Sequence, residues 1–246
     1  MFSLANLSSI RQFLLVTDQL SSPADFYLHQ SLANHLKGTP EAKCLVLSVS
    51  ESISKWKAIA GKSNVNLQHH LASGSLVFVD LLSTAQPVPS TTSHVKSTLR
   101  PVLEHIREII SVWRTSGSSE IQVILDDISG LEWIGFSPLD VSRFVRALVA
   151  SCRNLNTALI VRHHIITPGE PDDLLRQLLQ LCTYHLEVLP LSTGKSGAVS
   201  GQVALHFGSS TFATSIRPIP RSSAIQYKLT DTACVFFERG TGSTVL

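Results

Sequence analysis

The stretch that decides the fold is Glu120-Ile121-Gln122-Val123-Ile124-Leu125-Asp126-Asp127-Ile128-Ser129-Gly130. Its continuous run of β-branched and leucine residues is typical of a strand that is buried on both faces of a parallel sheet. The run ends at two carboxylates, Asp126 and Asp127, and a Ser-Gly turn follows. In open α/β sheets, ligands bind beyond the carboxyl ends of the central strands, and in P-loop ATPases an Asp at such an end helps to hold Mg²⁺. Whether these carboxylates are catalytic therefore depends on whether the chain also carries a phosphate-binding loop.

The first turn of the chain lacks the residues that hold phosphate. The sequence predicts a strand over Gln12–Thr17 and a helix over Pro23–Lys37, with the preceding serine as its N-cap. A P-loop would place G-x-x-x-x-G-K-[ST] between them, because its backbone amides and its lysine contact the phosphates. The turn instead reads Asp18-Gln19-Leu20-Ser21-Ser22-Pro23, which contains neither glycine nor lysine. We therefore expect no nucleotide here, and we interpret Asp126 and Asp127 as a degenerate Walker B-like pair that caps the following turn through side-chain hydrogen bonds.

Two other segments match only the end of the phosphate-binding motif. They are Gly61-Lys62-Ser63 and Gly194-Lys195-Ser196. The glycine that the motif needs five positions earlier is replaced by Trp56 in the first segment and by Leu189 in the second. Neither segment lies between an early strand and its helix, so both are predicted to be turns.

The remaining hydrophobic pattern predicts the fold class. Further buried strands alternate with helical segments and are expected over Lys43–Val49, Ser75–Leu81, Thr157–Val161 and Thr183–Val188. Short alternating segments then indicate antiparallel hairpins over Gln202–Phe207, Phe212–Ile216, Ile225–Leu229 and Val235–Glu238. The chain is predicted to be a single α/β domain over residues 1–246, with a mostly parallel sheet flanked by helices and C-terminal antiparallel hairpins.

Composition limits the classes of partner. Apolar residues make up 43% of the chain and charged residues only 15%, which suits a surface that is partly buried by other subunits. With a net charge of +2, the chain by itself is not expected to bind nucleic acid strongly, because such binding rests on many contacts from Lys and Arg to phosphate. Four widely spaced cysteines indicate free buried thiols in a reducing compartment. No apolar stretch is long enough to span a membrane.

Candidate functional side chains are few. Arg162, His163 and His164 follow the predicted strand Thr157–Val161, where they could contact RNA phosphate or a base edge or simply form a turn. Adjacent histidines in a regular strand cannot both point into one site. The ten histidines show no metal-ligand spacing, so no metal is expected. The chain also lacks G-x-S-x-G and G-x-G-x-x-G, so we expect neither catalytic residues nor a bound cofactor.

Several blocks of the chain resemble the sixth subunit of the Elongator complex. The blocks cover most of the sequence, and the C-terminal one is the most specific: Ile225–Gly240 with Val245-Leu246, Gly74–Asp80 and Val123–Ser129. The resemblance implies a RecA-like pseudo-ATPase that has lost its nucleotide-binding loop. It also implies that loops 128–137 and 165–173 face the lumen of a ring, which makes Arg162, His163 and His164 candidates for proximity to tRNA.

The same resemblance implies partners and a location. Members of this family pair with Elongator subunits four and five, and two copies of each form a six-membered ring that binds tRNA and joins the remaining Elongator subunits. The assembly modifies the wobble uridine of tRNA anticodons. The ring responds to ATP, so the question of whether a nucleotide binds at the subunit interfaces is left open. The expected location is the cytoplasm, with the nucleus as a second site left open. The alternatives are an active RecA-like ATPase in DNA recombination and subunit five of the same ring.

Overall fold

The computed structural model describes residues 12–84, 99–191, 194, 197–211, 216–231 and 233–238. The strands are β1 (Phe13–Gln19), β2 (Lys43–Ser48), β3 (Leu76–Asp80), β4 (Ile121–Leu125), β5 (Ala158–Ile165), β6 (Tyr184–Leu189), β7 (Gly201–Phe207), β8 (Ile225–Leu229) and β9 (Cys234–Phe237). The helices are α2 (Asp25–Gly38), α3 (Ile53–Lys62), α4 (Leu67–Ala72), α5 (Leu81–Thr84), α6 (Leu99–Thr115), α7 (Ser129–Trp133), α8 (Pro138–Asn154), α9 (Asp173–Leu181) and the 3-10 turn η1 (Arg221–Ser223).

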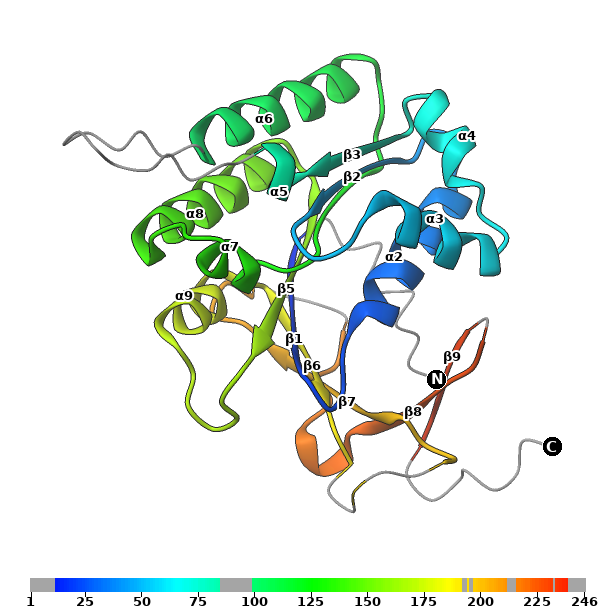
Figure 1. The fold of residues 1–246 in the computed structure, drawn as a ribbon, viewed down its shortest axis with the longest axis vertical. Coiled ribbons are helices and arrows are strands. Elements are labelled where there is room, and N and C mark those ends of the chain that lie inside the picture. The colour runs from blue at the N-terminus through cyan, green and yellow to red at the C-terminus, as the bar shows by residue number, and fades with distance from the viewer. Residues whose placement is uncertain are drawn as a thin grey trace.

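All strands of the described residues join one nine-stranded sheet in the order β3-β2-β4-β5-β1-β6-β7-β8-β9 (Figure 1). The six strands from β3 to β6 in this order pair in parallel, and β7, β8 and β9 add antiparallel pairs. Helices cover both faces of the parallel part. The predicted fold class is therefore confirmed: a RecA-like, mostly parallel sheet flanked by helices, with antiparallel strands at its C-terminal end.

The strand pattern explains the two layers of helices. Phe13 and Leu15 of β1 belong to the apolar cluster that includes α6, α8 and α9, whereas Leu14 and Val16 belong to the cluster that includes α2 and α3. Successive side chains of a strand point to opposite faces, so an uninterrupted apolar run fills both layers. Every residue of β4 is buried, as its continuous apolar run predicts. β1 and β5 thus lie at the centre of the sheet, beneath helices on both sides.

The structure corrects several predicted boundaries. β5 continues to Ile165, so Arg162, His163 and His164 lie inside the strand and not in a turn after it. β5 extends this far because every residue of β1 pairs with it, from Phe13↔Leu159 to Gln19↔Ile165. The predicted loop 128–137 contains the short helix α7, and Leu81, predicted to end a strand, begins α5. The short helix α4 is not predicted, because six residues show no clear apolar period.

Parts of other predictions lie outside the described residues. These are most of the strand predicted over Phe212–Ile216, together with Lys195 and Ser196. All four cysteines are free thiols, as predicted; three are buried and Cys234 is partly exposed.

We expect Gly208→Ala to destabilise the fold. A Cβ at Gly208 would lie 2.1 Å from the carbonyl oxygen of Cys182, which is a backbone atom and cannot move aside cheaply. Overpacking of this kind costs about 1–3 kcal/mol. Urea denaturation followed by circular dichroism measures the loss. In the control Gly61→Ala, the new Cβ meets no atom within 4 Å, and an alanine in a helix stabilises by about 0.5–1 kcal/mol. Equal free energies of unfolding for the two variants would contradict the close contact at Gly208.

Candidate functional site

The β1–α2 turn, residues 18–25, lies where a P-loop protein binds phosphate. Asp18 is the last residue but one of the central strand β1, and its carboxylate is completely buried. Its Oδ2 accepts a hydrogen bond from the backbone N–H of Ala24, the N-cap of α2, at 2.6 Å. A helix amino end is a natural anion site because its N–H groups are unsatisfied and its dipole favours negative charge. The chain's own carboxylate therefore takes the position that a P-loop leaves for phosphate.

Arg162 of β5 binds the acids of this turn. Its Nε donates to Asp18 Oδ2 at 2.9 Å, and one terminal nitrogen donates to Asp25 Oδ1 at 2.5 Å. The side chain of His164, two residues further along the same face of β5, faces Asp18 Oδ1 with its Nδ1 at 2.9 Å. Burial by itself would lower the pKa of Arg162, but the charges of Asp18, Asp25 and Asp127 outweigh it and raise that pKa. The guanidinium therefore stays charged and joins β1, β5 and α2.

The predicted N-cap of the first helix is wrong. The helix begins at Asp25, two residues after Pro23, and Ser22 lies before its N-cap. The backbone N–H of Ser22 donates to the carbonyl of Gln19 at 2.9 Å, which closes the turn. Its hydroxyl lies 3.3 Å from the Tyr227 hydroxyl on β8. The backbone N–H of the N-cap residue Ala24 is instead bound by Asp18, whose carboxylate also compensates the buried Arg162.

The carboxylate of Asp126 binds the turn after β2 and not, as predicted, the turn that follows Asp126 itself. Its carboxylate accepts backbone N–H groups from Val49 at 2.7 Å and from Ser50 and Glu51 at 3.3 Å, together with the hydroxyl of Ser48. Burial raises the pKa of Asp126, while the hydrogen bonds from Ser48, Val49 and Ser50 oppose that shift. Both oxygens are thus occupied by the chain, and the residue holds β4 against the start of α3.

Asp127 serves the turn that follows it. Its Oδ1 accepts the backbone N–H of Ser129 at 3.0 Å and that of Gly130 at 3.4 Å, at the start of α7. This is the side-chain hydrogen bonding that the Asp-Ser-Gly pattern indicates. No group of three or more His, Cys, Asp or Glu side chains in the described part of the chain is placed to hold a metal ion.

His163 and His164 point to opposite faces of the sheet, as their adjacency in a strand predicts. His163 Nδ1 lies 3.1 Å from the Ser129 hydroxyl, and its Nε2 lies 3.1 Å from Asp172 Oδ2. The hydrogen bond from His163 lowers the pKa of Asp172, which also caps α9 through the N–H of Leu175. All three residues proposed to lie near tRNA therefore bind carboxylates of their own chain in this structure.

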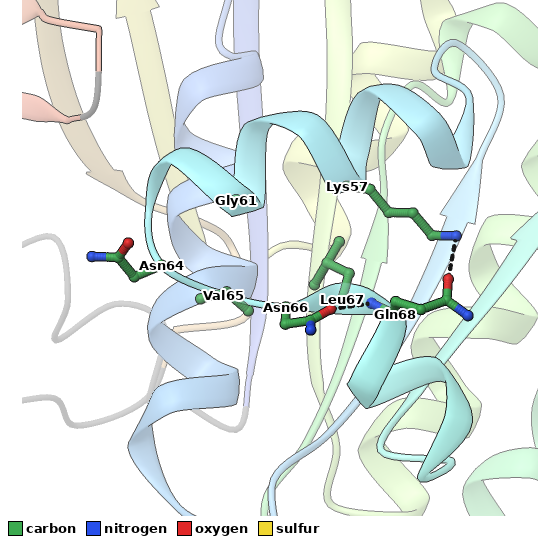
Figure 2. Close-up of a pocket in the computed structure, with 7 residues that line it drawn as sticks. All are labelled: Lys57, Gly61, Asn64, Val65, Asn66, Leu67 and Gln68. Atoms are coloured by element: carbon green, nitrogen blue, oxygen red, sulfur yellow. Dashed lines mark hydrogen bonds between the residues drawn. The ribbon is translucent and has the colours of Figure 1, made fainter.

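The segment Gly61-Lys62-Ser63 ends a helix and does not begin one. It lies at the carboxyl end of α3, where Ser63 N–H donates to Ala60 O at 3.0 Å. Figure 2 shows the neighbouring hollow between α3 and α4, where Lys57 donates to Gln68 Oε1 at 2.7 Å. No strand ends there, so the segment lacks the strand–turn–helix setting of a phosphate loop.

A polar cluster on β6 has no counterpart in the sequence-based predictions. His185 Nε2 lies 2.7 Å from the Thr17 hydroxyl, and Glu187 binds Arg221 at 2.7 Å and faces His206 at 3.2 Å. Burial lowers the pKa of His185 to about 4, and the charges of His206, Arg221 and His163 add to the shift while Glu187 opposes it. His185 and Glu187 alternate with buried apolar residues in β6, which is the one signal in the sequence that they share a face.

We expect Arg162→Met to destabilise the protein strongly, because Asp18 would remain buried without its counter-charge. Removing one partner of a buried ion pair costs about 3–5 kcal/mol. Urea denaturation measures the loss. The matched control is Arg176→Met, whose ion pair with Asp173 is exposed on both sides and contributes less than about 1 kcal/mol. A free energy of unfolding for Arg162→Met close to that of the control would contradict the role given to Arg162.

We expect stability to fall as the pH drops from about 6.5 to about 4. In this window the unfolded chain protonates His185, whereas the folded chain keeps it neutral, so protons favour the unfolded state. Across this window the free energy of unfolding should fall by about 3 kcal/mol, which is the shift in the pKa of His185 converted at 1.36 kcal/mol per pKa unit. His185→Gln keeps a hydrogen-bonding group opposite Thr17 and removes the titration. Urea denaturation at several pH values should therefore show that the free energy of unfolding falls less steeply with decreasing pH for the variant than for the wild type. Equal pH dependence in the two proteins would contradict the role given to His185.

Comparison with known proteins bears on the identity of the chain. Residues 5–231 match the family model described as Elongation complex protein 6. The matched segment spans most of the sequence, including the β1–α2 turn, the β4 carboxylates and β8. A search of the curated proteins gave no significant match. Among the described residues, no helix has both the length and the apolar character needed to cross a bilayer. The chain therefore belongs to the Elongation complex protein 6 family.

Proposed function

We propose that this chain is a non-catalytic subunit of the Elongator tRNA-modification assembly. In this proposal it forms a six-membered ring with subunits four and five, and the ring binds tRNA and supports modification of the wobble uridine. The observation that carries the proposal is the contact of Asp18 with the amino end of α2 and with Arg162. It fills the place where an ATPase of this fold would hold phosphate, while family membership supplies the assembly.

Large apolar side chains next to the β1–α2 turn support a role in holding neighbours. Leu20 in the turn is 87% exposed and Ile166 after β5 is 63% exposed. The charges beside them, on Arg162 and Asp18, compensate each other inside the chain. The cores of protein–protein interfaces are rich in apolar side chains and depleted of unpaired charges. The surface beside the β1–α2 turn has both properties.

In this proposal the end of β5 lies near tRNA. Arg162, His163 and His164 bind carboxylates, so we assign them the task of holding the following loop in place. Residues 167–171 of that loop, which follow the interface residue Ile166, are exposed and extend beyond β5. In the ring they face the lumen and approach the RNA. Location in the cytoplasm, with the nucleus as a second site, is part of the same proposal.

The two alternatives have weaker support. An active ATPase for DNA recombination would need the anion position that Asp18 occupies. Subunit five of the same ring would be expected to match a different family description. Neither has an observation of its own among the described contacts.

Co-expression with candidate subunits four and five tests the proposal. We expect a hexamer by mass measurement, tRNA binding by the hexamer and not by the single chain, and no ATP hydrolysis by the chain alone. Ile166→Glu should weaken assembly, because it places a charge in the proposed interface. Val112→Glu is the matched control, since Val112 is also 63% exposed but lies on α6, away from the turn. A stable, ATP-hydrolysing single chain, or equal assembly by both variants, would contradict the proposal.

A further inference from the structure

A cleft of about 470 Å³ lies between α2, α3 and the β8–β9 hairpin. We call it the lysine cleft, after Lys37, Lys55 and Lys62, which line it. In Figure 1 these elements lie together on the side of the sheet opposite α6 and α8. Its volume falls in the range of sites that bind small molecules, about 300–1,000 Å³. Nothing in the proposed ring function uses it.

The charged groups around the cleft favour an anion. Lys62 is exposed and has no hydrogen bond or ion pair within the described part of the chain, while Lys37 donates to the carbonyl of Ser63 at 2.5 Å and Lys55 binds Glu51. Two acids also line the cleft, but Asp25 is compensated by Arg162. The rim is therefore positive on balance, with Asp231 as the remaining opposing charge.

The walls between these charges are apolar. Phe26, Ile59 and Leu229 line the cleft, and the ring of Phe26 stacks on that of Tyr227 with centroids 4.6 Å apart. Apolar walls with a few convergent polar groups are the usual composition of a small-molecule site. An occupant should therefore have an apolar body and an anionic head.

Three buried polar atoms of the cleft residues His29 and Gln30 lack hydrogen bonds within the described part of the chain. His29 and Gln30 both line the cleft; His29 is 6% exposed. Among the described residues, neither ring nitrogen of His29 and not Gln30 Oε1 has a hydrogen-bond partner. His29 Nε2 lies 2.9 Å from Glu51 Oε2, but the two atoms are not aligned for a hydrogen bond. Gln30 Oε1 is an acceptor, and a neutral imidazole carries one acceptor nitrogen. Because an unsatisfied buried acceptor is costly, a ligand that carries a hydrogen-bond donor would relieve this cost.

We propose that the lysine cleft binds a small organic anion, one that has a phosphate or carboxylate head, an apolar body and at least one hydrogen-bond donor. The lysines contact the head, the apolar wall contacts the body, and His29 or Gln30 accepts from the donor. The cleft adjoins the β1–α2 turn, because Asp25 belongs to both, but Asp18 and Arg162 do not line it.

Titration of the full-length chain with three matched probes tests this site. The probes are 4-hydroxyphenyl phosphate, 4-hydroxybenzoate and the uncharged 4-hydroxybenzyl alcohol, followed by NMR of histidine-labelled protein. At least one charged probe should bind saturably, at least tenfold more tightly than the alcohol, and should shift the His29 resonances. The tighter of the two anions identifies the head group. No saturable binding by either anion, or equal affinity for the alcohol, would overturn the proposal.

A lysine pair supplies the matched control. Lys62→Ala should weaken binding of the anion about fivefold, the factor expected for one charge at about 4 Å in a water-like dielectric. Lys57→Ala removes the same charge from the same helix, but its ammonium binds Gln68 in the other hollow (Figure 2), so affinity should not change. Equal affinities for the two variants would place the anion elsewhere and overturn the assignment.

Discussion

The buried contact between Asp18 and Arg162 is the constraint on which the rest of the central sheet depends. A charged arginine inside a parallel strand is costly unless a carboxylate compensates it, and Asp18 does so from the neighbouring strand. The same carboxylate satisfies the amino end of α2. One side chain thereby compensates the arginine of β5, binds the N-cap of α2 and occupies the anion position of the fold.

The acids that would serve catalysis in an ATPase of this fold serve structure here. Asp126 holds the turn after β2, and Asp127 begins α7. Phosphoryl transfer depends on positioned charges that are free to meet substrate and metal, and these carboxylates already bind backbone N–H groups. At this edge of the sheet, the apolar side chains of Leu20 and Ile166 are exposed to solvent. A surface of this kind suits a subunit that acts through its neighbours.

The sequence predicts much of the fold because local patterns decide it. The apolar run of β4 and the alternation of strands and helices are visible in the chain itself and lead to the fold class. The missing glycine and lysine of the first turn are visible too, and they lead to the expectation that no nucleotide binds there. The length of β5 is not visible, because Arg162 and Asp18 are 144 residues apart and only tertiary pairing makes a polar strand end stable. The helix α7 is also hidden, since five residues give too short a period to recognise. The lysine cleft depends on a hairpin meeting α2 and α3, which no local pattern encodes.

The β1–α2 turn cannot hold a triphosphate while Asp18 contacts Ala24 and Arg162. The decisive experiment is a crystal structure of the chain grown with saturating Mg²⁺ and ATP. We expect the contacts of Asp18 to remain in place and no triphosphate to lie between Asp18 and Asp25. A triphosphate bound at the amino end of α2, with Arg162 released from Asp18, would contradict this expectation.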